Sequence, residues 1–211
     1  MICKEYSTIF IHIPKTAGQS IENFFLHKVG LDWERRESFL LRPKKSNELG
    51  PPRLAHLRVE EYVHYGYISS ELFSSYFTFS IVRNPWDRMI SFYYYLQYHK
   101  RMNFTTFIKE FYRIYKEEEN YWFVRPQYEY LQNNKGKIEI DYIGRFENLQ
   151  KSFDYICKQL GFKRTLLPKI NISTHRPKKY PSTYQHYYNS KIRNIVAEIH
   201  QKDIEYFKYK F

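Results

Sequence analysis

A lysine, a glycine and two hydroxyl side chains lie close together in the loop Pro14–Ser20, between an apolar stretch and a helical pattern. Backbone N–H groups at the start of a helix, together with the helix dipole, form a site for anions. Gly18 would let the backbone approach a ligand closely, and Lys15 would reach a phosphate oxygen as a point charge. Thr16 and Ser20 add hydroxyl donors. The spacing therefore predicts a phosphate-binding loop.

The order of these residues differs from that of nucleoside triphosphate loops. In those loops the lysine follows the last glycine, and a serine or threonine then holds Mg²⁺. Here Lys15 precedes Gly18, and no acidic residue at a strand end is well placed to hold the ion. We therefore expect no metal at this loop. The alternative interpretation is an ordinary turn between a strand and a helix, with a solvated lysine.

A second candidate segment, Ser80–Tyr93, contains an arginine and a serine two helical turns apart. Arg83 follows an apolar stretch, at the carboxyl end of an expected strand, where α/β proteins place their ligands. An arginine fork combined with the hydroxyl of Ser91 suits a phosphate monoester. The alternative is a buried Arg83–Asp87 pair that fixes the loop, with Ser91 as an ordinary helix residue.

These segments must be held by regular elements, and the hydrophobic pattern indicates which. Apolar runs predict buried strands at Ser7–Ile13, Tyr76–Val82 and Ile138–Phe146. Because helical patterns separate these strands, the fold class is α/β, with three layers in which helices flank a central parallel sheet. A short strand is predicted at Arg53–Leu57, and helices at Ser20–Lys28, Val59–Tyr67, Trp86–Tyr98, Phe104–Lys116, Tyr121–Gln132, from about Asn148 to Leu160, and after Asn189.

Composition narrows the class of protein further. A chain of 211 residues suits a single domain, 1–211, and its net charge of +12 favours anionic partners such as nucleotides, acidic polysaccharides, nucleic acid or lipid. Cys3 and Cys157 lack metal-ligand spacing and are expected to be reduced packing residues. No apolar run is long enough to span a bilayer, and no signal peptide is visible, so we expect a cytoplasmic protein.

Together, the two phosphate-binding candidates resemble motifs of the PAPS-dependent sulfotransferases, in particular the carbohydrate branch that includes the heparan sulfate 2-O-sulfotransferases. His12–Ser20 matches the family's His-Ile-Pro-Lys-Thr-x-Gly-x-Ser core, with Ala17 where a glycine is common. Val82–Tyr93 matches its Val-Arg-Asn-Pro-x-Asp-Arg-x-x-Ser-x-Tyr core without a gap. Gly144–Leu149 and the ending Asp203–Phe207 also look like this family, so the resemblance spans nearly the whole chain.

The resemblance implies a P-loop-like sulfotransferase fold and 3′-phosphoadenosine-5′-phosphosulfate (PAPS) as sulfuryl donor, without a metal. It places Lys15 at the 5′-phosphate and at the bridging oxygen, and Arg83 and Ser91 at the 3′-phosphate. The lack of a membrane anchor departs from Golgi relatives and suggests a soluble, bacterial-type member. The other nucleotide contacts expected in the loop are backbone or hydroxyl donors of Thr16, Ala17, Gly18, Gln19 and Ser20.

A histidine between the two motifs is the expected general base. An alcohol that attacks sulfur must lose its proton, and histidine titrates near neutral pH. The segment Ala55–Arg58 resembles the segment that carries the catalytic base in the 2-O-sulfotransferase branch, which points to His56. His64 is the main rival, whereas His12 lies on an expected buried strand and is expected to be structural.

A late basic loop, Asn171–Lys179, is a further candidate for nucleotide binding. Sulfotransferases often close such a loop over the nucleotide, and Ser173 and Arg176 are the residues that would do so here. The alternative is a solvated run of charges.

The predicted reaction moves a sulfuryl group from PAPS to a hydroxyl of a carbohydrate or glycolipid and leaves 3′-phosphoadenosine-5′-phosphate (PAP). His56 would act as the base, and Lys15 would stabilise the leaving oxygen. A small alcohol or phenol as acceptor stays open. A basic module for nucleic acid or other anions is the alternative from another class, although the basic residues are dispersed and no RNA-binding motif is present. A nucleotide kinase is disfavoured by the position of the lysine.

Overall fold

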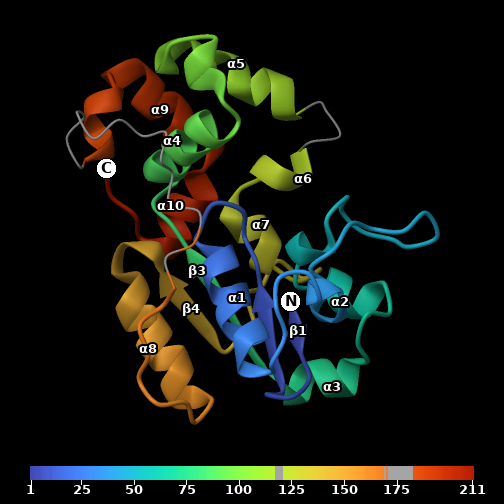
Figure 1. The fold of residues 1–211 in the computed structure, drawn as a ribbon. Coiled ribbons are helices and arrows are strands. Elements are labelled where there is room, and N and C mark those ends of the chain that lie inside the picture. The colour runs from blue at the N-terminus through green and yellow to red at the C-terminus, as the bar shows by residue number, and fades with distance from the viewer. Residues whose placement is uncertain (117–120, 169, 171–182) are drawn as a thin grey trace. The chain divides into compact units, whose positions relative to one another are not determined.

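The computed structural model describes residues 1–116, 121–168, 170 and 183–211 (Figure 1). The chain forms two compact units, each assembled from two separate stretches of sequence. The first holds Met1–Val82 and Glu129–Ile170, and the second holds Arg83–Tyr128 and Asn171–Phe211. The chain thus first crosses from one unit to the other between Val82 and Arg83. A single domain over residues 1–211 stays a prediction.

A four-stranded sheet lies in the first unit, in the order β1 (Ile2–Cys3), β2 (Thr8–Ile11), β3 (Phe77–Val82) and β4 (Tyr142–Arg145) (Figure 1). β2, β3 and β4 are parallel neighbours, while β1 pairs antiparallel with β2. With its flanking helices this is the predicted three-layer α/β class, which is confirmed. Each parallel strand falls inside a predicted one. β1 is too short to give a periodic signal and was not predicted.

One face of the sheet is covered by α1 (Gly18–Lys28) and α8 (Leu149–Gln159) through a cluster of aromatic rings. Phe24 of α1 meets Phe153 of α8 at 4.7 Å between ring centroids, and Phe25 lies 6.1 Å from Phe79 of β3. Burying one phenylalanine side chain contributes roughly 1.5–3 kcal/mol. These rings therefore fix both helices against the strands that carry the candidate motifs.

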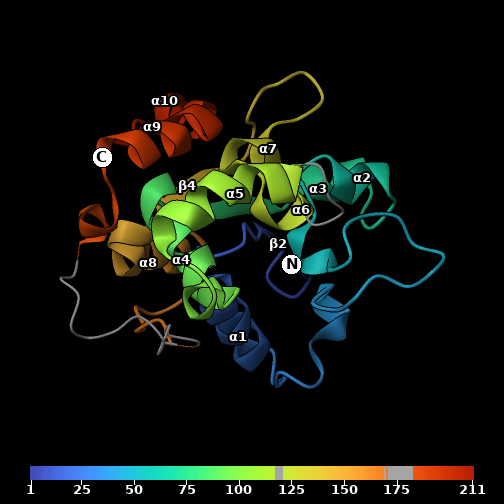
Figure 2. The same ribbon diagram turned by 90° about the horizontal axis from the view of Figure 1, so that it is seen from above.

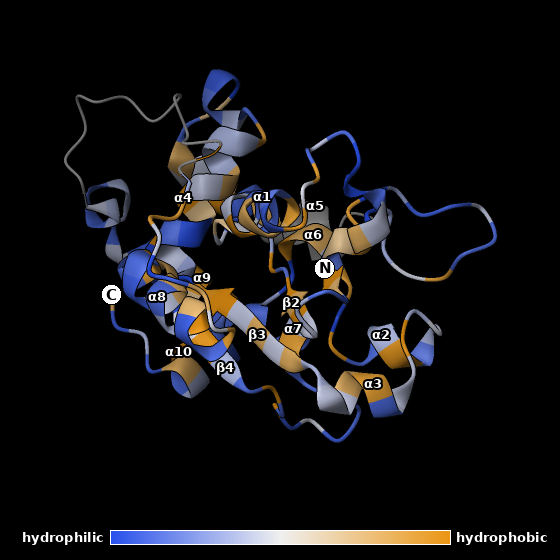
Figure 3. Ribbon diagram, turned by 60° about the horizontal axis from the view of Figure 1, so that its bottom comes forward, coloured by the Kyte–Doolittle hydropathy of each residue, from blue (hydrophilic) through white to orange (hydrophobic). Residues whose placement is uncertain are grey.

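The hydropathy pattern explains this packing (Figure 3). α1 carries both orange and blue segments, and its apolar residues Ile21, Phe24 and Phe25 are buried, as expected for a helix that packs one face on a sheet. The carboxyl end of β3 is orange, and its last five residues are all buried. Cys3 and Cys157 belong to the same core and are free thiols, in line with the expected packing role.

Further helices complete the two units. α9 and α10 follow each other and lie in contact in the second unit (Figure 2). α7 crosses the boundary between the units in sequence. The remaining bounds are α2 (Glu61–His64), α3 (Ser70–Ser75), α4 (Pro85–Tyr95), α5 (Phe104–Lys116), α6 (Tyr121–Val124), α7 (Gln127–Leu131), α9 (Ser190–Ile199) and α10 (Gln201–Phe207), with 3₁₀ turns at Arg36–Phe39, Leu54–His56, Tyr98–Lys100, Phe146–Asn148 and Tyr184–Tyr187.

Two of the predicted elements are wrong. The short strand at Arg53–Leu57 is a 3₁₀ turn over Leu54–His56, in which the amide of Leu57 donates to the carbonyl of Leu54 at 3.3 Å. This turn buries Leu54, His56 and Leu57 together, which an alternating strand would not do. The single helix predicted over Tyr121–Gln132 is interrupted between α6 and α7 at Pro126, which has no N–H to donate.

Candidate active site

The loop between β2 and α1 has an unusual backbone. Lys15 and Ala17 both have a positive φ of 70°, with Thr16 between them. Alternation of this kind turns neighbouring N–H groups to one side and forms a concavity that suits anions. The Thr16 side chain is fully buried and donates to the carbonyl of Ile13 at 2.8 Å, which holds the loop from within.

The N-terminus of α1 opens directly onto this loop. Ala17 occupies the N-cap position and has no polar side chain with which to cap the helix. The first N–H groups of a helix lack partners inside the helix, so a ligand anion is a suitable partner for them. The hydroxyl of Ser20, in the first turn of α1, accepts a hydrogen bond from the amide of Ile170 at 3.2 Å, which leaves its own proton to donate.

Gly18 is required by packing rather than by the approach of a ligand alone. A Cβ atom at this position would lie 2.0 Å from Nε2 of His12 and 2.1 Å from its Cδ2. The ring of His12 therefore lies directly against the backbone at the start of α1. The sequence suggests that Gly18 lets a ligand approach the backbone closely. The structure adds a second reason for glycine at this position, the close packing of the His12 ring.

His12, Glu22 and His56 form a buried polar cluster beside the loop. Their exposed fractions are 6%, 1% and 8%. Nδ1 of His12 lies 2.6 Å from Oε1 of Glu22, and the two imidazole rings are 4.4 Å apart. His12 is thus structural, as predicted, because it joins α1 to the end of β2.

The hydrogen bond of His56 fixes its tautomer. Nδ1 of His56 lies 2.9 Å from the backbone carbonyl of His12. A carbonyl only accepts, so Nδ1 carries the proton and Nε2 holds the lone pair. Burial, reinforced by the neighbouring His12, lowers the pKa of His56 well below its ordinary value. His56 is therefore a neutral imidazole at pH 7, the form that a general base requires.

The rival histidine has a different environment. His64 is the last residue of α2, is exposed to solvent and stacks at a tilt on Tyr65 at 5.2 Å. This surface position provides none of the fixed geometry that surrounds His56.

In the second unit, Arg83 lies directly after β3 and is 9% exposed. Its Nε and Nη2 atoms donate to one carboxylate oxygen of Asp87, at 2.8 and 2.7 Å. The ion pair considered as the alternative is thus present. It lays the guanidinium along the first turn of α4, and Ser91 lies one turn further on the same helix face, because residues four apart share a face.

Hydrogen bonds fix both the backbone of Arg83 and the start of α4, which follows it. The side chain of Asn84 caps α4 by accepting from the amides of Trp86 at 3.0 Å and Asp87 at 3.4 Å. The side-chain amide of Gln127 bonds to the backbone N–H and C=O of Arg83. Sequence reasoning did not single out Gln127, because 44 residues separate it from Arg83.

The structure thus groups the predicted residues in two sets. The loop from Lys15 to Ser20 and His56 belong to the first unit, and Arg83 and Ser91 belong to the second. Ser173 and Arg176 lie outside the described residues. Across the described parts of the chain, no group of three or more His, Cys, Asp or Glu side chains is arranged to hold a metal ion. Nor does any described helix have the length and apolarity to cross a membrane.

Comparison with known proteins places the chain in a family. The chain is 34% identical over 108 residues to an uncharacterized protein of Archaeoglobus fulgidus. The aligned region covers 49% of this chain and 83% of that relative. No solved structure gives a significant match. The model of the sulfotransferase family matches residues 1–210. The chain therefore belongs to the sulfotransferase family.

Proposed function

We propose that the protein transfers the sulfuryl group of PAPS to a hydroxyl of a carbohydrate or glycolipid, with His56 as general base. The observation that carries the proposal is the fixed tautomer of His56, whose Nδ1–H is committed to the carbonyl of His12 at 2.9 Å. That carbonyl belongs to the residue that starts the phosphate-binding motif. The base and the loop are therefore joined by one hydrogen bond.

The nucleotide would be held by both motifs. Lys15 and the N–H groups at the start of α1 take the 5′-phosphosulfate, supported by the positive φ values in the loop. Arg83 and Ser91 take the 3′-phosphate, supported by the ion pair of Arg83 with Asp87, which lies one turn before Ser91 on α4. Because β2 and β3 are parallel neighbours, the segments that follow them start from the same edge of the sheet.

The chemical step then divides between two side chains. Nε2 of His56 removes the proton of the acceptor hydroxyl as its oxygen attacks sulfur. The bond from sulfur to the bridging oxygen breaks, its electron pair stays on the 5′-phosphate of PAP, and the ammonium of Lys15 stabilises that charge. The products are a sulfate ester and PAP. Glu22 supports this step indirectly, since it holds His12, whose carbonyl orients the base.

The acceptor class and the cellular location are proposed from the sequence motifs and from the cysteines. A carbohydrate acceptor follows from the resemblance of both motifs to the carbohydrate branch. A small alcohol or a phenol would use the same base and donor. A cytoplasmic location is supported by the two buried free thiols, Cys3 and Cys157.

The decisive test is transfer of labelled sulfate from PAPS to a panel of acceptors, together with thermal unfolding in the presence of PAP. We expect PAP to raise the melting temperature and at least one sugar acceptor to take up label. If only phenols take up label, the acceptor is a phenol and the carbohydrate acceptor is wrong. A protein that neither binds PAP nor labels any acceptor would refute it.

A further inference from the structure

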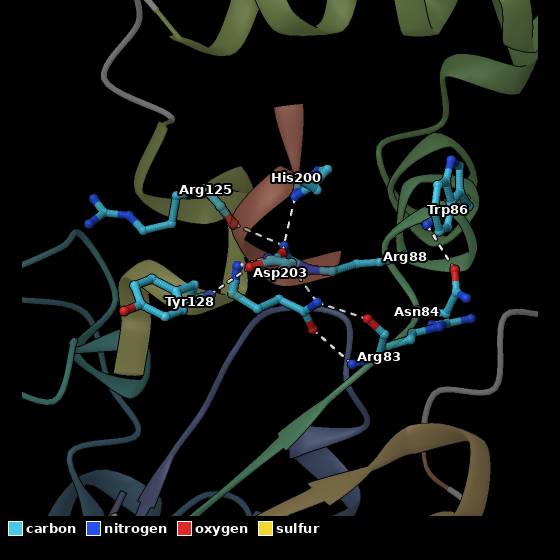
Figure 4. Close-up of polar contacts among 9 residues, drawn as sticks. Arg83, Asn84, Trp86, Arg88, Arg125, Tyr128, His200 and Asp203 are labelled. Atoms are coloured by element: carbon cyan, nitrogen blue, oxygen red, sulfur yellow. Dashed lines mark hydrogen bonds and ion pairs between the residues drawn. The ribbon is translucent and has the colours of Figure 1, made fainter. Parts of the chain in front are cut away.

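A buried carboxylate in the second unit is the centre of a polar network (Figure 4). Asp203, on α10, is 0% exposed, and its carboxylate lies among hydrogen-bond donors from Gln127, Tyr128 and His200. Its Oδ1 atom accepts from the amide of Tyr128 at 2.7 Å, and its Oδ2 atom accepts from the amide of Gln127 at 2.9 Å. Nδ1 of His200 lies 3.2 Å from the same Oδ2 atom. A buried carboxylate so surrounded is a rigid anchor, because every alternative position would leave it unsatisfied.

The charge state of this anchor is consistent with that role. Burial acts to raise the pKa of Asp203, but the hydrogen bond and charge of His200 and the amides of Gln127 and Tyr128 outweigh it. The pKa is therefore lowered, and Asp203 is ionised at neutral pH.

Gln127 transmits the position of this anchor to Arg83. Its side chain is 0% exposed. The Oε1 atom accepts from the backbone N–H of Arg83 at 2.8 Å, and the Nε2 atom donates to the backbone carbonyl of Arg83 at 2.8 Å. Nε2 also lies 3.4 Å from Oδ2 of Asp203. Reversing the amide would place oxygen against two acceptors, so its orientation is fixed.

Arg83 is consequently held from two directions. Gln127 fixes its backbone, and Asp87 fixes its guanidinium through two bonds to one oxygen. An arginine restrained in this way loses little freedom when it binds an anion, and preorganisation of this kind strengthens binding.

We propose that Gln127 and Asp203, assisted by His200, are positioning residues that give the enzyme its preference for a nucleotide with a 3′-phosphate. This inference rests on the proposed function, in which Arg83 takes that phosphate. It assigns a role to the Asp203–Phe207 ending, which the phosphate motifs leave unexplained. It also predicts that α10, late in the chain, controls a property of the donor site.

If the network only stabilised the fold, its loss would weaken the binding of all ligands equally. If it positions Arg83, its loss should weaken only the binding of ligands that carry a 3′-phosphate. PAP and adenosine 5′-phosphate (AMP) share the 5′-phosphate, but AMP lacks the 3′-phosphate. The ratio of the two dissociation constants therefore isolates the 3′-phosphate contacts. The variant Gln127→Met keeps the length of the side chain and removes both bonds to the backbone of Arg83.

The experiment measures PAP and AMP binding by calorimetry for the wild-type chain, Gln127→Met, Asp203→Asn and Asn189→Ala. Asn189 caps α9 in the same unit, with its Oδ1 3.1 Å from the amide of Ile192, at the opposite end of that helix from His200. Its variant is the control for a general loss of stability. Hydrogen bonds to charged groups justify an expected wild-type preference for PAP of about tenfold or more.

We expect Gln127→Met to lose about tenfold in PAP affinity while AMP affinity stays within about twofold, and Asp203→Asn to show a smaller loss of the same kind. Asn189→Ala should keep the wild-type ratio. An unchanged ratio in Gln127→Met and Asp203→Asn, or an equal loss for both nucleotides, would overturn the inference. If Gln127→Met does not fold, Asp203→Asn decides the question. A wild-type chain that does not prefer PAP to AMP would instead refute the proposed function.

Discussion

Replacing His56 by asparagine separates its chemical role from its structural one. The Nδ2 amide of asparagine can stand where Nδ1 of His56 now donates to the carbonyl of His12 at 2.9 Å. The variant thus keeps the buried hydrogen bond and loses the outer part of the ring with the lone pair at Nε2. General base catalysis contributes about 10²–10⁴-fold, so we expect His56→Asn to lower kcat by that factor and to leave PAP affinity nearly unchanged.

Thermal unfolding of the His56 variants tests the structural role of the same hydrogen bond. His56→Ala leaves the carbonyl of His12 unsatisfied and buried, which costs about 1–3 kcal/mol. For a chain of this size that loss lowers Tm by roughly 2–4 °C per kcal/mol. His56→Asn should unfold closer to the wild-type temperature, and His64→Asn, on the exposed end of α2, is the matched control for both assays.

The pH dependence supplies a third measurement. Because burial lowers the pKa of His56, this histidine stays neutral at the pH where an ordinary histidine becomes protonated. It takes up a proton only at lower pH. We expect kcat/KM of the wild-type enzyme to stay level as pH falls through about 6.5 and to decline only at lower pH, where His56 of the folded enzyme becomes protonated. The same shift means that the folded state resists protonation, so stability falls on the acid side of about pH 6.5. Wild-type kcat in His56→Asn, with the same acid limb, would refute the assignment of the base.

Three further variants test the loop. Lys15→Ala removes the cation expected at the leaving oxygen, so it should weaken PAP binding and lower kcat by at least about tenfold. Calorimetry measures the binding and sulfate transfer measures kcat. An unchanged kcat would contradict that role. Gly18→Ala should lower the free energy of unfolding by at least about 1–3 kcal/mol in urea, because its Cβ would stand 2.0 Å from Nε2 of His12. Ala17→Gly relieves a positive φ of 70° and should raise stability by about 0.5–1 kcal/mol; a lower Tm would contradict this.

Local patterns predicted the elements that carry the motifs. The apolar runs around β2, β3 and β4 are long enough to be recognised, and the predicted helix Phe104–Lys116 agrees with α5 at both ends. Pro126 stands inside the predicted helix Tyr121–Gln132, and the prediction from apolar periodicity did not take this helix breaker into account. β1 and the separate helix α10 carry too few residues for a periodic signal.

The environment of the site residues could not be predicted in the same way. The bond between Gln127 and Arg83 joins residues 44 positions apart, and that between Gln127 and Asp203 joins residues 76 apart. Neither spacing has a period that a pattern could reveal. The tautomer of His56 depends on one carbonyl of a distant strand end. Residue types therefore indicated which chemistry to expect, whereas the preorganisation of those residues required coordinates.

The two buried thiols of the core make this enzyme suitable for site-specific labelling. Burial raises the pKa of Cys3 to about 12 and that of Cys157 to about 11. At pH 8 the thiolate fraction of Cys3 is therefore only about one part in ten thousand, and thiolate is the form that maleimides attack. A single cysteine introduced on the surface would react far ahead of both native ones. Fluorophores or spin labels could thus be attached without first removing Cys3 and Cys157 from the core that supports β2 and α1.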